Sequence, residues 1–250
     1  MTAVEVLRVV LPLPVRRALI SLRRRVQGVP APGRVAFGDL RRLSPISRDF
    51  GSDRGPPLDR HYIEAFLERQ RADVQGRVLE IGEDTYTRRF GGDRVTRADV
   101  LHVNDRNPRA TFVGDLATAD HIPSDAFDCI ILTQTLQLIY ELRPAILTLH
   151  RILKPGGVLL ATVPGTTPVV GWSEWGPIWH WSFTELVMRR LLGEAFAADA
   201  LTLETHGNVL AATALLHGLA ADELTAEEID LRDPDYPVII TARALKAAGG

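Results

Sequence analysis

Residues 77–92 have the sequence RVLEIGEDTYTRRFGG, and the rest of the chain is organised around them. Val78 to Ile81 is a short apolar run that only Glu80 interrupts, and Gly82 ends it. Polar residues follow, so the pattern predicts a buried strand that ends in a tight turn. In open α/β sheets, ligands bind just beyond the carboxyl ends of such strands. A glycine there lets the backbone approach a ligand closely, because it has no Cβ atom.

The segments around this stretch alternate between helical and strand patterns. We expect helices at 58–73, 143–153, 184–196 and 209–219, and further strands at 95–103, 110–116, after Phe127-Asp128, after Lys154-Pro-Gly-Gly157, at 200–205 and at 238–245. Alternation of this kind is typical of α/β domains with a mostly parallel sheet. With 250 residues, the chain is long enough for one large domain of this class.

Three of these segments resemble class I S-adenosylmethionine-dependent methyltransferases. Val-Leu-Glu-Ile-Gly82 resembles the first motif of the family, and Pro123-x-x-x-Phe127-Asp128 resembles the entry to its fourth strand. The turn Lys154-Pro-Gly-Gly157 before an apolar strand is the most specific match. The resemblance is strong over residues 76–164 and implies a Rossmann-like fold. Its seven-stranded sheet would be mostly parallel with an antiparallel last strand, and helices would cover both faces.

The resemblance also implies S-adenosylmethionine as the cofactor and a set of positions that bind it. These are Glu80, Gly82, Glu83, Asp84, Asp99, Val100, Asp115, Leu116, Thr133 and Gln134. Asp99 lies about 20 residues beyond the glycine turn, where a carboxylate at the end of the second strand holds a ribose. Asp105 is the alternative for this role. Asp115 and Leu116 match the adenine position, and Thr133 and Gln134 follow the fourth strand.

The first motif departs from the family pattern, because only Gly82 of its glycine-rich loop is kept. Glu83, Asp84 and Thr85 follow it instead. The two carboxylates would lie where the methionine end of the cofactor binds. They could attract its sulfonium and ammonium groups or repel its carboxylate.

An aromatic segment follows the fifth strand, where this fold shapes its acceptor site. All four tryptophans, Trp172, Trp175, Trp179 and Trp181, fall within ten residues. Aromatic faces stack on sugars and planar rings, so we interpret residues 165–183 as the acceptor side. The alternative is a hydrophobic lid packed on the core. His180 is the candidate general base, with Glu174 as the alternative, because a neutral imidazole accepts a proton near pH 7.

The ends of the chain differ in charge and composition. Residues 1–60 contain twelve arginines and five acidic residues, a net charge of +7, so the remainder carries −9. We expect a basic arm at 1–57 and a methyltransferase domain at 58–250. The arm would make peripheral contact with an anionic membrane or remain solvated. An insertion at 207–236 would cover the site or support a homodimer. The start of the chain does not resemble a signal peptide, so we expect a cytoplasmic protein.

The sequence therefore predicts methyl transfer from S-adenosylmethionine to a small-molecule or saccharide acceptor, at oxygen. The resemblance is closest to bacterial methyltransferases associated with polysaccharide biosynthesis. The alternative is a non-catalytic binding or scaffold protein with the same fold, which the missing glycines favour. A nicotinamide-dependent oxidoreductase is disfavoured, because the Gly-x-Gly-x-x-Gly fingerprint is absent. The negative net charge argues against a nucleic-acid substrate, and the sequence contains no clustered Cys/His metal motif.

Overall fold

The computed structural model describes residues 12, 14–15, 22–23, 26–169 and 176–248. The chain forms two compact units, Met1–Leu43 and Ser44–Gly250. The described part of the first unit contains one short 3-10 turn, η1 (Gly38–Leu40). Most of the basic segment at 15–26 lies outside the described residues. Residues 44–57, which we expected in the basic arm, belong to the second unit.

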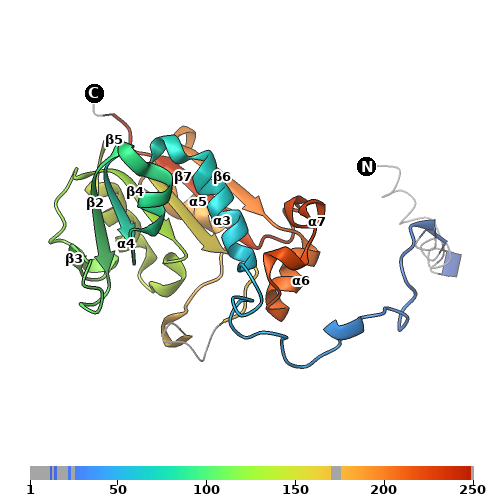
Figure 1. The fold of residues 1–250 in the computed structure, drawn as a ribbon. Helices are drawn as coiled ribbons and strands as arrows, with labels where there is room; N and C mark the ends of the chain where they lie inside the picture. Colours follow the sequence, from blue (N-terminus) through green and yellow to red (C-terminus); the bar gives the residue numbers. More distant parts are fainter. Residues whose placement is uncertain (1–11, 13, 16–21, 24–25, 170–175, 249–250) are drawn as a thin grey trace. The chain divides into compact units, whose positions relative to one another are not determined.

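The second unit is built on a seven-stranded sheet with the order β3-β2-β1-β4-β5-β7-β6 (Figure 1). The strands are β1 (Gly76–Ile81), β2 (Val95–His102), β3 (Phe112–Val113), β4 (Phe127–Thr133), β5 (Leu153–Pro164), β6 (Leu201–His206) and β7 (Ile239–Leu245). β1 to β5 pair in parallel, whereas β7 is antiparallel to both β5 and β6. The predicted sheet is confirmed, although the third strand is much shorter than the expected 110–116.

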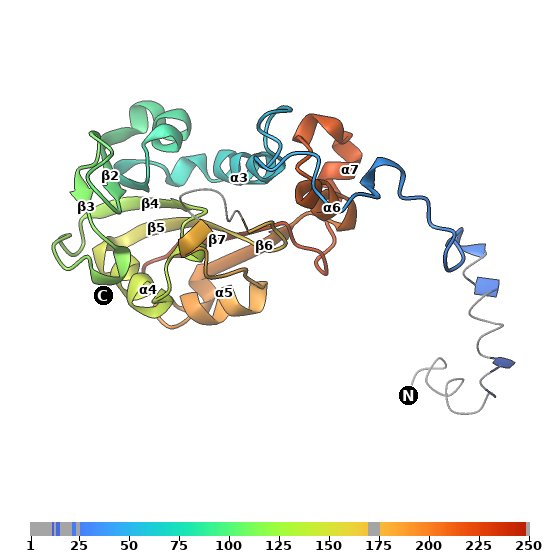
Figure 2. The ribbon, with the colours of Figure 1, turned by 90° about the horizontal axis from the view of Figure 1, so that it is seen from below.

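Helices cover both faces of this sheet (Figure 2). They are α3 (Leu58–Arg69), α4 (Leu142–Ile152), α5 (Glu185–Leu192), α6 (Val209–His217) and α7 (Ala226–Asp230). Successive strand side chains point to opposite faces, so neighbours such as Val78 and Leu79 enter different cores. Leu79 packs in the cluster that includes α4 and α5, and Val78 in the cluster that includes α3 and α6. Among the described residues, no helix is long and apolar enough to cross a bilayer.

The crossover from β1 to β2 is unusually short. Two helical residues, 85 and 86, lead into the π-helical turn η3 (Thr87–Gly91), and the 3-10 turn η4 (Gly92–Arg94) follows before β2 begins. The degenerate loop after Gly82 therefore leads into a short helical segment over residues 85–94. The position of this loop depends on side-chain contacts from β1 and from the loop after β2.

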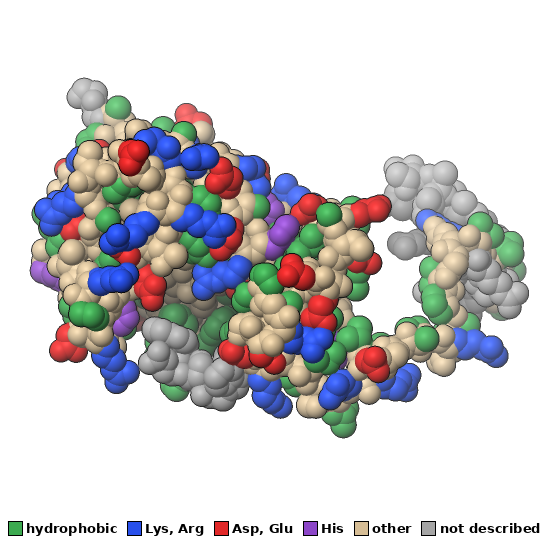
Figure 3. Space-filling model, in the orientation of Figure 1, with side chains coloured by type: hydrophobic (Ala, Val, Ile, Leu, Met, Phe, Trp, Pro, Cys, Tyr) green, Lys and Arg blue, Asp and Glu red, His purple; other side chains and the backbone are tan. Residues whose placement is uncertain are grey.

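Residues 44–57, which we call the strap, pack against the insertion at 207–236. The backbone N–H of Ile46 donates to the carbonyl of His217 (2.8 Å), and that of Ala221 donates to Pro56 (2.8 Å). Arg54 donates through Nε to Glu223 (2.9 Å). Acidic side chains gather over α6 and α7 in Figure 3. The strap and the insertion thus form one wall beside the sheet.

Candidate functional site

Gly82 marks the carboxyl end of β1 and has φ +92°. Its N–H donates to Leu101 (2.9 Å), and its carbonyl accepts from Asn107 Nδ2 (2.6 Å). A Cβ atom built on Gly82 would meet no atom within 4 Å. The backbone conformation favours glycine, and the open space beside it lets a ligand approach the peptide group.

Glu80 fixes the loop that follows. Its buried carboxylate accepts hydrogen bonds from the backbone N–H groups of Thr87 (2.7 Å) and Tyr86 (3.1 Å). Burial raises the pKa of Glu80 to about 7, although the backbone hydrogen bonds from Thr87 and Tyr86 oppose this shift. Glu80 on β1 therefore holds the start of the short crossover in place through these two hydrogen bonds.

Asp84 joins the two loops at this edge of the sheet. Its buried carboxylate accepts from Arg88 Nε (2.6 Å) and lies 3.5 Å from Arg109 Nη1, which belongs to the loop after β2. Hydrogen bonding from Arg88 lowers the pKa of Asp84, with Arg109 contributing. Glu83 is exposed and accepts from the Thr85 hydroxyl (3.1 Å). The two carboxylates that follow Gly82 thus differ, because only Asp84 is neutralised by arginines.

Asp99 does not lie at the end of the second strand, and the expected position is wrong. β2 continues to His102, and Asp99 pairs in register with Leu79 in the interior of β1. The fully buried carboxylate accepts from Arg77 Nε (2.7 Å) and Arg97 Nη2 (3.1 Å). Val100 is also buried within the strand. An aspartate engaged in this way is a structural ion pair rather than a ribose ligand.

Val103, Asn104 and Asp105 follow β2. Asn104 is half-buried and accepts from the backbone N–H of Arg106 (3.1 Å), while Asp105 is exposed. After β3, the Asp115 side chain accepts from the Ala117 N–H (2.8 Å) and so caps a 3-10 turn, η5 (Leu116–Thr118). Leu116 is buried in the core. Asp115 is at the predicted strand end, and its exposed carboxylate retains acceptor capacity.

The end of β4 carries an unusual conformation. Gln134 follows Thr133 directly and has φ +47°, which is uncommon for a residue with a side chain. Gln137 donates through Nε2 to the Gln134 carbonyl (2.8 Å). The buried atoms Gln134 Nε2 and Gln137 Oε1 have no hydrogen-bond partner in the described structure. Strained backbone and unpaired polar atoms together are features of a functional edge.

An aromatic cluster, which comprises Tyr140, His180 and Trp181, lies beside this strand end. The backbone N–H of His180 donates to the Gln137 carbonyl (2.8 Å), and Trp181 Nε1 donates to Ile139 (3.0 Å). The Tyr140 ring stacks on Trp181 at 5.8 Å and meets His180 edge-on at 5.4 Å. Tyr140 is 64% exposed and Trp181 37% exposed. The cluster is thus fixed by hydrogen bonds while its rings remain accessible.

The strap reaches the same segment through Phe50. The Phe50 ring stacks on Trp179 at 6.5 Å, and its backbone has φ +51°. Trp172, Trp175 and the alternative base Glu174 lie outside the described residues. The expected acceptor segment therefore meets the end of β4 at its carboxyl-terminal part, from Trp179 onward.

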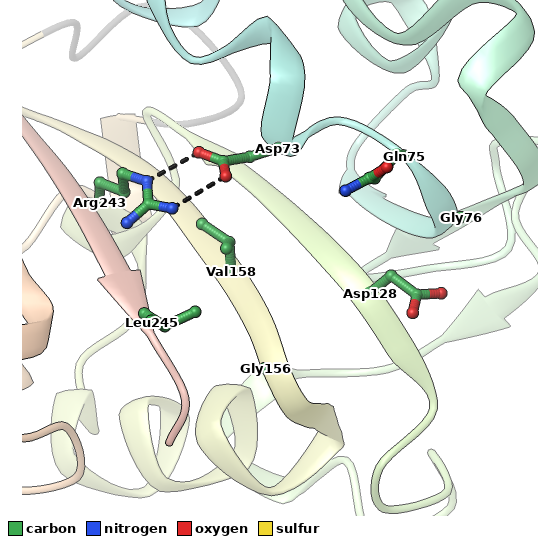
Figure 4. A pocket seen from close by; sticks show the side chains of 8 residues that line it. All are labelled: Asp73, Gln75, Gly76, Asp128, Gly156, Val158, Arg243 and Leu245. Atoms are coloured by element: carbon green, nitrogen blue, oxygen red, sulfur yellow. Dashed lines mark hydrogen bonds and ion pairs between the residues drawn. The ribbon is translucent and has the colours of Figure 1, made fainter. Parts of the chain in front are cut away.

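A pocket of about 310 Å³ lies at the opposite, amino-terminal edge of the sheet (Figure 4). Asp73 and Arg243 form a bidentate pair across it (2.7 and 2.9 Å). Asp128 accepts from Lys154 Nζ (2.7 Å) and from the backbone N–H of Arg77 (2.8 Å). The charged groups of this pocket are thus paired with one another. None of the residues that the sequence predicted for the site lines the pocket.

Comparison with known families finds one match along the chain. The family described as a methyltransferase domain matches residues 82–161, from Gly82 to the middle of β5. The match covers 80 of the 250 residues. This match supports an S-adenosylmethionine-dependent methyltransferase, with S-adenosylmethionine as the cofactor. No curated protein matches the sequence.

Solved structures share the fold at low identity. An S-adenosylmethionine-dependent methyltransferase from Archaeoglobus fulgidus has a TM-score of 0.51 and 13% identity over 75% of this chain and 94% of that one. One from Mesorhizobium loti has a TM-score of 0.51 and 16% identity over 75% and 97%. The [4+2]-cyclase SpnF has a TM-score of 0.51 and 19% identity over 78% and 85%. Because a cyclase shares it, the fold alone does not decide the reaction.

The residues at the carboxyl edge fit the cofactor. The space beside Gly82 admits a ligand to the backbone, and Gln134 Nε2 is an unused donor at the end of β4. Asn104 and Asp105 supply side-chain oxygens after β2, where a ribose would be held. Sequence reasoning missed Asn104, Asn107 and Tyr140. The only signal for the end of β2 was Asp105, the acidic residue that we gave as the alternative to Asp99.

Proposed function

We propose that the chain transfers a methyl group from S-adenosylmethionine to a saccharide hydroxyl. The observation that carries this proposal is the arrangement at one edge of the sheet. Gly82, with its positive φ and open flank, follows β1, and the hydrogen-bonded aromatic cluster follows the adjacent β4. The first feature suits the cofactor and the second suits an acceptor ring.

For the cofactor, we propose contacts from the ends of four strands. Gly82 and Glu83 would flank the methionine end, Asp105 would accept from the ribose hydroxyls, and Asp115 and Gln134 would lie near the adenine. Glu80 and Asp84 would act by positioning the loop, because their carboxylates are already engaged by Thr87 and by Arg88. Buried Leu116 and half-buried Thr133 would support these positions.

For the acceptor, the exposed faces of Tyr140 and Trp181 are suited to a sugar ring, whose C–H faces pack on aromatic rings. When bound, S-adenosylmethionine supplies an already activated methyl group, so alignment of the acceptor provides much of the rate. The exposed His180 imidazole is the proposed proton acceptor for the hydroxyl. Saccharide acceptors would place the enzyme in polysaccharide biosynthesis in the cytoplasm.

A non-catalytic binding protein is the second candidate. The observation in its favour is that Asp84, with Arg88 and Arg109, occupies part of the loop that glycines form in the family. Membrane contact through the basic arm and a homodimer through the insertion are compatible with either function. Neither requires a nucleic-acid partner.

The test is calorimetric titration with S-adenosylmethionine and S-adenosylhomocysteine, followed by transfer of a labelled methyl group to a panel of saccharides. Binding of both compounds and labelling of a saccharide would support the proposal. Binding without transfer to any acceptor would favour the non-catalytic protein. Absence of binding to either compound would overturn the proposed function.

A further inference from the structure

We propose that Arg88 and Arg109 receive the carboxylate at the amino-acid end of S-adenosylmethionine. This inference rests on the proposed function and deepens it, because it gives the degenerate loop a part in recognising the cofactor. The loop after Gly82 lacks the further glycines of the family pattern. Asp84 would act in their place as a positioning residue that holds the two arginines.

The observation that carries this inference is the convergence of two arginines from different loops on one buried carboxylate. Arg88 donates through Nε and Nη2 to Asp84 Oδ2 (2.6 and 2.5 Å), and Arg109 Nη1 lies 3.5 Å from Oδ1. The side chain of Asp84 is 7% exposed, whereas those of Arg88 and Arg109 are 70% and 69% exposed. The aspartate is thus enclosed, and both guanidinium groups remain accessible from solvent.

Several donors of these guanidinium groups are unused. Within the described part of the chain, Arg88 Nη1 and the Nε and Nη2 atoms of Arg109 make no hydrogen bond. Two positive charges meet the single negative charge of Asp84, so one positive charge is uncompensated. Guanidinium groups are weakly hydrated and bind carboxylates through paired N–H donors. A second carboxylate, supplied by a ligand, would use the free donors and balance the charge.

Direct contacts connect these residues to Gly82. Asp84 lies two positions beyond Gly82, so their Cα atoms are at most about 7 Å apart. Asn107 Nδ2 donates to the Gly82 carbonyl (2.6 Å), and the backbone N–H of Arg109 donates to Asn107 Oδ1 (2.9 Å). The backbone N–H of Arg88 donates to the Asp84 carbonyl (3.0 Å). Both arginines are therefore tied to the loops that adjoin the open space beside Gly82.

The neighbouring charges match an amino-acid group, which carries a carboxylate and an ammonium on one carbon. Glu83 precedes Asp84, is exposed, and accepts from the Thr85 hydroxyl (3.1 Å). Its carboxylate is an acceptor for the ammonium, beside the two arginines that would receive the carboxylate. The repulsion that Asp84 would exert on the cofactor carboxylate is offset by the same two arginines.

The experiment compares two ligands by calorimetry. S-adenosylhomocysteine carries both the carboxylate and the ammonium, whereas its decarboxylated analogue keeps only the ammonium. We expect Arg109→Gln to weaken S-adenosylhomocysteine by about three- to tenfold, between the loss of an exposed ion pair and that of a charge-assisted hydrogen bond. Arg88→Gln should act in the same direction. Binding of the decarboxylated analogue should remain unchanged in both variants.

The matched control is Arg71→Gln. Arg71 is an exposed arginine that pairs with Glu68 (3.0 Å), and it lies in the 3-10 turn η2 (Arg71–Asp73), before the amino end of β1. Its replacement should alter neither affinity. The melting temperature of Arg109→Gln without ligand should stay close to that of the wild type, because Asp84 keeps its hydrogen bonds from Arg88.

The outcomes separate this inference from the proposed function. Unchanged affinity for S-adenosylhomocysteine in both Arg88→Gln and Arg109→Gln would overturn this inference alone. An equal loss for the two ligands would also overturn it, since the arginines would then act through the loop. Equal affinity of the wild type for the two ligands would show that the carboxylate is not recognised. Failure of the wild type to bind S-adenosylhomocysteine would overturn the proposed function, and this inference with it.

Discussion

The carboxylate of Glu80 accepts a 2.7 Å hydrogen bond from the backbone N–H of Thr87, which binds the end of β1 to the start of η3. This contact compensates for the short crossover between β1 and β2. It also makes the loop sensitive to the protonation state of a buried acid.

The pKa of Glu80 should appear in the stability profile. Its folded pKa of about 7 lies above the ordinary value of 4.5, so the folded protein binds this proton more tightly than the unfolded chain does. The corresponding stabilisation is complete below pH 4.5 and is lost as the pH rises to about 7, a change of about 3 kcal/mol. Glu80→Gln should flatten this part of the curve of melting temperature against pH. Parallel curves for the two proteins would contradict the assignment.

The conformation of Gly82 predicts a loss of binding that exceeds the loss of stability. Gly82→Ala should cost about 1 to 2 kcal/mol of folding free energy, because φ +92° is unfavourable for a residue with a Cβ atom. The same methyl group would enter the space beside the loop and lower cofactor affinity more than tenfold. Gly156→Ala is the matched control, since Gly156 has φ +79° and equally open surroundings at the other sheet edge. Equal effects of both variants on cofactor affinity would remove Gly82 from the site.

The two aspartates of the second strand region should behave differently. Asp99→Asn leaves Arg77 without its buried partner and should lower stability by about 3 kcal/mol, with cofactor affinity kept at temperatures where the variant is folded. Asp105→Ala should leave stability within about 0.5 kcal/mol, because the side chain is exposed, and should weaken cofactor binding. Calorimetry and thermal unfolding of the two variants separate these roles. The opposite pattern would restore Asp99 as the ribose ligand.

The aromatic cluster should affect the acceptor and not the cofactor. Tyr140→Ala removes an exposed ring that stacks on Trp181, so we expect the KM for a saccharide acceptor to rise by about two- to tenfold, the loss of one stacking contact. The dissociation constant for S-adenosylhomocysteine should not change. Tyr236→Ala, which removes another exposed tyrosine, is the control. An unchanged KM in Tyr140→Ala would place the acceptor elsewhere.

The fold could be predicted because its signals are local. Glycine after Ile81, the Lys154-Pro-Gly-Gly157 turn and the apolar runs between them locate strands without knowledge of distant partners. The residue at which each strand ends could not be predicted, since an apolar run such as 95–103 does not reveal which of its residues is the last to pair with a neighbouring strand. Asp99 was placed wrongly because its partner Arg77 lies on the neighbouring strand.

The candidate site was harder to predict, because it depends on burial and on backbone conformation. The sequence around Gln134 does not reveal that this residue has φ +47°. The sequence around Asp59 does not reveal that its Oδ1 atom is enclosed without a side-chain partner. Aromatic density near Trp181 did indicate the acceptor side. Its contact with Tyr140 depends on the hydrogen bond between Trp181 Nε1 and the Ile139 carbonyl, which links segments far apart in sequence.

The strap has a consequence for synthesis on the ribosome. Arg54 and Glu223 are separated by 169 positions, so the strap emerges long before the residues on which it docks. During translation it must wait, unpaired, until the insertion at 207–236 has been made. A nascent chain released before that point can complete most of its parallel sheet yet lacks His217 and Ala221, the backbone partners of Ile46 and Pro56. The wall beside the sheet is therefore among the last parts of the unit to assemble.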